Sequence, residues 1–207
     1  MRTSGCGVEP DLEPGDSLED LSRRLALAIP GDTVRGTFFL GTLDTVRECR
    51  GEAGVRRCLA AVDEPRLMEF FHYPLGTFLR LNEAAVVELA PGGGGWTCAQ
   101  RRLGRRAAVD LLTSAAGRAL VLLSRGETRR LMGNLPSAYR AAVNHGERSV
   151  VWEGASRGRV IMRRDFMPCA FHEGVLGAML ESTKARGVVV QGARLDVLDS
   201  EYRVEWE

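Results

Sequence analysis

The alternation of apolar and polar positions is clearest at the end of the chain. In residues 202–206, Tyr202 and Val204 alternate with Arg203 and Glu205. This period of two predicts a strand with one face on a core and one face in water. Two runs rich in β-branched residues, 149–153 and 159–163, are joined by a glycine-containing turn, and residues 188–197 precede the final strand across an Asp-Ser turn. These four runs predict two antiparallel hairpins.

Helical periodicity covers most of the remaining chain. Residues 171–186 carry apolar side chains at helical spacing, and the pattern stops at Gly187. Within it, Gly174, Gly177 and Ala178 would allow another backbone to approach closely. Further upstream, residues 33–39 are expected to be extended, and helices are predicted over 17–29, 43–49, 54–61, 66–71, 75–89, 98–123 and 128–143, the last interrupted near Pro136.

These elements predict an α+β fold. An N-terminal helical layer packs on a four-stranded antiparallel sheet with a crossing helix, in the order β-β-α-β-β. Residues 1–16, rich in glycine, proline and acidic residues, are predicted to be a flexible tail, and residues 17–207 a single domain. The length of 207 residues suffices for a full core without metal or disulfide crosslinks.

Charge and cysteine content exclude several classes of function. The net charge of +1 gives no electrostatic reason to expect a nucleic-acid partner. Five cysteines form no paired framework, which is typical of reduced thiols, and no apolar stretch reaches the length of a membrane span. We therefore expect a cytoplasmic protein.

Two positions have the composition of a chemical site. Cys169 and His172 stand three residues apart at the start of the crossing helix, where they could form a catalytic pair or half of a metal site. No second ligand pair accompanies them, so a buried structural cysteine and a histidine at the rim of the core are the favoured interpretation. His72 could ligate haem from a pocket, although a histidine held at a helix junction is commoner. A cysteine-dependent enzyme using Cys169 is kept as an alternative to a protein without enzymatic activity.

Arginines gather at helical spacing in the second half of the helical region. A solvated helix face is the ordinary interpretation of such a cluster. If the protein is instead an interaction domain, four of them would form a docking face for an acidic partner: Arg101, Arg105, Arg129 and Arg130.

Several short motifs resemble those of a paralogous family of uncharacterised proteins expanded in myxobacteria. They lie at residues 71–74, 78–81, 102–105, 114–119, 135–140, 174–178 and 202–206. As a set they extend the resemblance from about residue 34 to the end of the chain. The resemblance implies no activity, because that family is itself a domain of unknown function.

The order of elements also resembles, more distantly, a superfamily of four-vinyl-reductase-type sensors, haem nitric-oxide-binding domains and TRAPP vesicle-tethering subunits. This resemblance implies either a dimeric scaffold or binding of an apolar ligand, a haem or an acyl chain between helices and sheet. The chain departs from both metal-containing branches. Residues 202–206 are not the Tyr-x-Ser-x-Arg pattern that holds haem propionates, and the cysteine cluster of the zinc-bearing sensors is missing beyond Cys169. Haem and zinc are therefore not favoured.

The leading hypothesis is a non-enzymatic regulatory or sensory module. It would bind a small apolar ligand between helices and sheet and signal to an unidentified partner protein. The residues expected around the pocket combine apolar bulk with polar tips: His72, Tyr73, Phe78, Tyr139, Trp152, Cys169 and His172. The alternative is a ligand-free protein-protein interaction domain or a homodimeric scaffold.

Overall fold

The computed structural model describes residues 14–62 and 66–207, with side chains from residue 19 onward. Most of the predicted tail, residues 1–13, lies outside the described residues. The first helix, α1 (Pro14–Leu27), begins three residues before the predicted start at residue 17.

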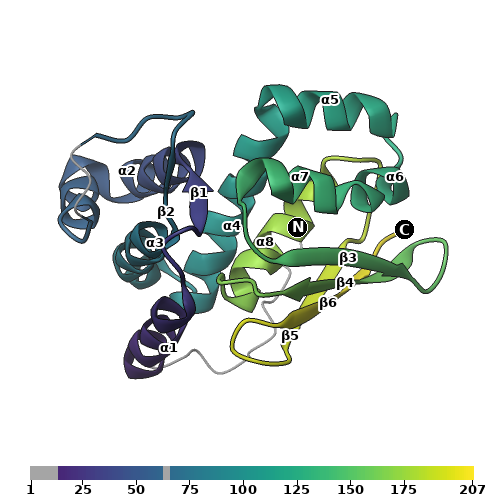
Figure 1. Ribbon diagram of the computed structural model, residues 1–207. Helices are drawn as coiled ribbons and strands as arrows, with labels where there is room; N and C mark the ends of the chain where they lie inside the picture. The colour runs from purple at the N-terminus through teal and green to yellow at the C-terminus, as the bar shows by residue number, and fades with distance from the viewer. Residues whose placement is uncertain (1–13, 63–65) are drawn as a thin grey trace.

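The helical layer is built from α1, α2 (Gly36–Leu59), α3 (Leu75–Leu89) and α4 (Gly95–Thr113), as Figure 1 shows. Strands β1 (Thr33–Arg35) and β2 (His72–Pro74) pair antiparallel and lead directly into α2 and α3. The extended segment predicted over 33–39 ends at Arg35, and the helix predicted over 66–71 is absent. Gly51, with a φ of 64°, breaks α2 between the two helices predicted there.

The prediction of one long helix over residues 98–123 is wrong, because two helices cover this range. The short 3-10 turn η1 (Ala90–Gly92) precedes α4, and α4 meets α5 (Ala115–Ser124) at a bend of 82°. Ser114 has extended backbone there, and its Oγ accepts a 3.0 Å hydrogen bond from the Gly117 amide. An N-cap of this kind starts a new helix in a new direction. Helices α6 (Thr128–Gly133) and α7 (Leu135–Ala142) follow, divided just before Pro136 as predicted.

The sheet confirms the predicted hairpins. Its strands are β3 (Glu147–Trp152), β4 (Arg157–Arg163), β5 (Val189–Arg194) and β6 (Ser200–Glu205), in the order β3-β4-β6-β5 with every neighbouring pair antiparallel. The crossing helix α8 (Cys169–Glu181) lies behind the sheet in Figure 1. Tyr202 and Val204 are fully buried and Arg203 is exposed, as the period of two requires.

Helices α4 and α8 cross with their backbones in direct contact. A Cβ added to Gly104 would lie 1.8 Å from the carbonyl oxygen of Phe171, and one added to Gly174 would lie 2.0 Å from that of Arg101. Only glycine allows this approach. The crossing fixes α4 against α8 and so sets the space left between them and the neighbouring helices.

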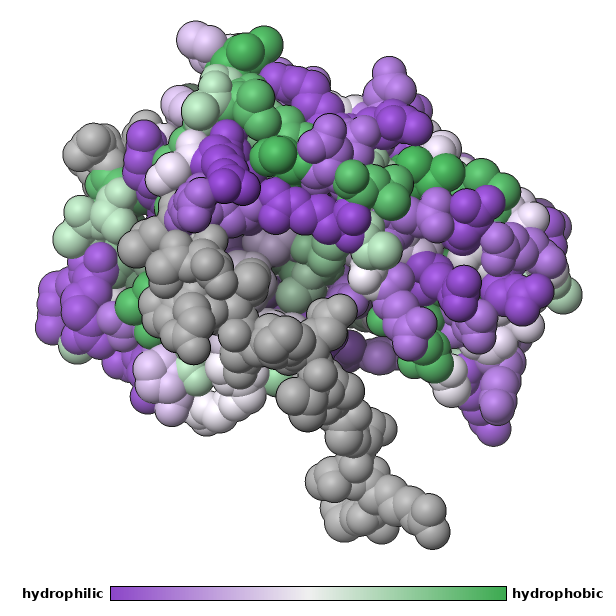
Figure 2. Space-filling view, turned by 90° about the horizontal axis from the view of Figure 1, so that it is seen from below, coloured by the Kyte–Doolittle hydropathy of each residue, from purple (hydrophilic) through white to green (hydrophobic). Residues whose placement is uncertain are grey.

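The surface seen from below is mainly hydrophilic, with apolar residues in smaller groups among the polar ones (Figure 2). No single helix in the described part of the chain is long and apolar enough to cross a membrane. The α4 and α5 pair meets the length and composition only when both are counted together across their 82° bend.

Candidate functional site

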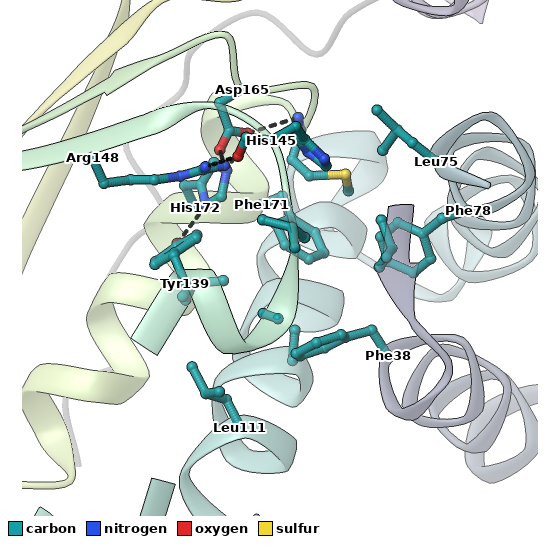
Figure 3. A pocket seen from close by; sticks show the side chains of 16 residues that line it. Phe38, Leu75, Phe78, Leu111, Tyr139, His145, Arg148, Asp165, Phe171 and His172 are labelled. Carbon is teal, nitrogen blue, oxygen red and sulfur yellow. Dashed lines mark hydrogen bonds and ion pairs between the residues drawn. The ribbon is translucent and has the colours of Figure 1, made fainter. Parts of the chain in front are cut away.

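A cavity of about 60 Å³ lies where the helical layer meets α7 and α8. Most of its apolar wall consists of side chains from α2, α3, α4 and α8. Phe38, Leu75, Phe78, Leu111 and Phe171 surround it in Figure 3. The other apolar lining residues are Val34, Ala107, Ala142, Val143, Met167 and Val175.

Four polar side chains close one end of this cavity (Figure 3). The hydroxyl of Tyr139 is 2.9 Å from Nδ1 of His172, and Nε2 of His172 is 2.6 Å from Oδ1 of Asp165. The other oxygen of Asp165 pairs with the guanidinium of Arg148, which also lies over the Tyr139 ring. The backbone amide of Met167 donates a 3.0 Å hydrogen bond to Asp165. We call these four side chains, Tyr139, Arg148, Asp165 and His172, the buried polar cluster.

The two oppositely charged side chains of the buried polar cluster, Arg148 and Asp165, pair with each other. The side chains of Arg148 and Asp165 are only 4% and 2% exposed. Burial alone would raise the pKa of Asp165, but the neighbouring His172 and Arg148 hold it well below its usual range. Burial raises the pKa of Tyr139, so its hydroxyl keeps its proton. The carboxylate of Asp165 and the guanidinium of Arg148 thus have each other as partners, which leaves neither of them free to hold an ionic ligand.

His145 adds an unsatisfied polar atom to the same wall. This residue is 8% exposed, its ring stands edge-on to Phe166, and burial lowers its pKa to about 4. The imidazole is therefore neutral near pH 7. Its Nδ1 and the Nε of Arg148 are buried without a hydrogen-bond partner in the part of the chain that the structure describes. Buried polar atoms of this kind usually have a partner, from protein or from a bound molecule.

Three of the seven predicted pocket residues line the cavity: Phe78, Tyr139 and His172. The other four lie elsewhere. His72 is exposed on β2. Tyr73 is buried, but it packs on Phe39 and its hydroxyl accepts a 2.7 Å hydrogen bond from the Met68 amide.

Trp152 and Cys169 also have neighbours outside the cavity. Trp152 lies at the end of β3, where its ring packs edge-on to Trp206 and beneath the guanidinium of Arg129. Burial raises the pKa of the Cys169 thiol, against the effect of its hydrogen bond with Tyr202. A raised pKa keeps the thiol protonated, whereas a catalytic cysteine needs the thiolate.

Sequence reasoning missed Arg148, Asp165 and His145. Arg148 and Asp165 flank the first hairpin, and the register of β3 on β4 brings them together. A charged residue at a strand end is usually solvated, so nothing in the local pattern shows that this pair is buried.

The four predicted docking arginines divide into two pairs. Arg101 binds Glu173 at 2.7 Å and Arg105 binds Glu181, so both link α4 to α8. Arg130 pairs with Glu127 at 3.0 Å, and Arg129 lies over Trp152. Three of the four, Arg101, Arg105 and Arg130, therefore already have carboxylate partners within the chain.

The cavity does not fit a haem. A volume of about 60 Å³ is far below the ~300–1,000 Å³ of pockets for larger ligands, and the aromatic rings of Phe38, Phe78 and Phe171 line it. Both ring nitrogens of His172 are already engaged. Among the described residues, no group of three histidine, cysteine, aspartate or glutamate side chains is arranged to hold a metal ion.

Known proteins show where this fold occurs. The profile of a family described as "Protein of unknown function (DUF2378)" matches residues 27–207. No curated protein matches the sequence. The fold is similar to that of an H-NOX protein mutant from K. algicida, with a TM-score of 0.64, 13% identity and coverage of 84% of this chain and 96% of the other. An H-NOX protein from S. oneidensis gives a TM-score of 0.63, 11% identity and coverage of 84% and 99%. At these identities the likeness is one of fold.

Proposed function

Because the chain belongs to the family described as "Protein of unknown function (DUF2378)", we propose its function from the site itself. The protein is a non-enzymatic sensory module. It binds a small, uncharged, mainly apolar molecule in the cavity and passes the bound state to a partner protein.

The observation that carries this proposal is the apolar cavity with a buried polar end. Its wall is carbon-rich, so it favours an apolar molecule over water. The unsatisfied Nδ1 of His145 and Nε of Arg148 are two polar atoms on residues that line the same cavity. An ionic ligand is disfavoured, because the charges of Arg148 and Asp165 already match and an added charge would be buried without a partner.

The size of the cavity limits the ligand. At about 60 Å³ it is smaller than the ~150 Å³ engineered cavity that binds benzene. We therefore expect a molecule of a few heavy atoms. The likeness to H-NOX proteins, one of which is an oxygen-binding domain solved as its oxygen complex, supports a sensory role by fold analogy. In this chain the binding would not use haem, because the cavity does not fit one. The homodimer and the cytoplasmic location remain predictions.

Xenon tests the proposal, because it is apolar, uncharged and small. We expect ¹²⁹Xe NMR to show a bound-state shift that saturates with the wild-type protein. Ala142→Leu should abolish the shift by filling the cavity, since Ala142 is 7% exposed and lines it. Ala141→Leu is the matched control, because Ala141 is the neighbouring residue of α7 and lines a surface groove instead. Equal xenon shifts in the wild type and in Ala142→Leu would contradict the proposal.

A further inference from the structure

Helix α5 carries its apolar side chains outward. Leu122 and Leu123 are 78% and 73% exposed and Val121 is 38% exposed, whereas the buried residues of this helix are Gly117 and Ser124. An ordinary surface helix has the opposite arrangement. In Figure 1, α5 forms the outer edge of the molecule above α7. A large apolar surface left uncovered in this way marks an interaction site.

A groove of about 210 Å³ runs between α5 and α7. One wall is a helical stripe of α5: Ala116, Ala119, Leu120 and Leu123. The other wall begins at the N-cap of α7 and has the same spacing of i, i+3, i+4 and i+7: Asn134, Ser137, Ala138 and Ala141. Two facing stripes of mostly small side chains form the kind of groove in which an amphipathic helix docks.

The charge of the segment that contains both groove helices indicates the kind of helix that would fit. Residues 115–142 contain five arginines and a single acidic residue, Glu127, although the whole chain has a net charge of only +1. Arg118 and Arg140 bond to neighbouring oxygens of Thr113 and Ser137, and in the described part of the chain neither forms an ion pair with a carboxylate. A second copy of this chain would bring the same arginines face to face, which disfavours a symmetric dimer here.

We infer that the groove between α5 and α7 binds an amphipathic helix of a partner protein, with apolar anchors at i, i+3, i+4 and i+7 and carboxylates on its flanks. This inference rests on the proposed function in that it names the class of the partner protein. Its evidence comes from the groove, which is a different surface from the cavity. The inner cavity and the groove share Leu111 as a lining residue. Helix α7 also serves both, because Tyr139 and Ala142 line the cavity while Ala138 and Ala141 line the groove.

The test uses a fluorescent peptide with leucines at the four anchor positions and glutamates between them. We expect fluorescence anisotropy to show saturable binding that weakens as salt is added, because the arginines are exposed. A peptide with lysines in place of the glutamates, and a scrambled glutamate peptide without helical spacing, should bind at least about tenfold more weakly.

Variants locate the binding surface. Leu123→Glu and Ala141→Glu, one on each wall of the groove, should each weaken the glutamate peptide about tenfold or more. Val87→Glu is the matched control, because Val87 is 63% exposed on α3, away from the groove, and this variant should bind like the wild type. Melting curves check that all three variants are folded.

Three results would overturn this inference. The first is equal affinity for the glutamate and lysine peptides. The second is wild-type affinity in both groove variants. The third is binding to anionic phosphatidylglycerol vesicles that Leu123→Glu abolishes, without binding of the peptide. Because the peptide assay needs no ligand in the cavity and the xenon assay needs no peptide, either proposal can fail while the other stands.

Discussion

Replacing Asp165 with asparagine separates the buried polar cluster from ordinary surface ion pairs. The substitution keeps the shape of the side chain but removes the charge that Arg148 and His172 contact. The guanidinium of Arg148 is then left buried with no counter-ion. This should lower the free energy of unfolding by about 3–5 kcal/mol. At about 2–4 °C per kcal/mol for a chain of this size, the melting temperature should fall by roughly 6–20 °C.

The matched control is Asp199→Asn. Asp199 also pairs with an arginine, Arg163, and also accepts a 3.0 Å hydrogen bond from a backbone amide, that of Arg164. The side chain of Asp199 is 29% exposed and that of Arg163 is 63% exposed. The free energy of unfolding should therefore fall by less than about 1 kcal/mol in Asp199→Asn. Differential scanning calorimetry at pH 7 compares the melting temperatures of both variants with that of the wild type. Equal shifts in melting temperature would refute the claim that burial makes the cluster structurally important.

Two further predictions concern packing and pH. Gly174→Ala should lower the melting temperature, because the new Cβ would meet the Arg101 carbonyl at 2.0 Å, whereas Gly177→Ala, whose nearest neighbour is 3.9 Å away, should leave it unchanged or raise it slightly. Similar thermal melts for the two glycine variants would show that the α4 and α8 backbones do not touch. For pH, the pKa of His145 is about 4 in the folded protein against an ordinary 6.5, so the unfolded chain takes up this proton first on acidification. The free energy of unfolding should fall by about 3 kcal/mol between pH 6.5 and pH 4 from this residue, and the depressed pKa of Asp165 adds a loss below about pH 4. Urea titrations should show a shallower slope in His145→Gln over that range, and an unchanged slope would mean that His145 is not buried.

The sheet could be predicted from the sequence because strand signals are local. Period-two alternation around Tyr202 and Val204, together with short turns, fixed both hairpins. The bend between α4 and α5 could not be predicted in the same way. Apolar residues continue at helical spacing through Ser114, and nothing in that pattern shows that Leu122 and Leu123 point outward.

The candidate site was predictable only in part. Tyr139 and His172 stood out as amphipathic side chains near predicted helices, and both line the cavity. Arg148 and Asp165 are 17 residues apart and meet only when the first hairpin forms. Burial of such a pair depends on tertiary packing, which the local sequence does not encode.

The most direct test of the sensory role measures the affinity of the glutamate peptide with and without xenon. If a ligand in the cavity alters the groove, thermodynamic linkage requires that the ligand also alters the affinity for the peptide. A typical coupling free energy of 1–3 kcal/mol corresponds to a change in affinity of about 5-fold or more. We predict such a change in the wild type and none in Ala142→Leu, whose cavity is filled. Peptide affinity that is the same with and without xenon in the wild type, under conditions where xenon occupies the cavity, would contradict the account.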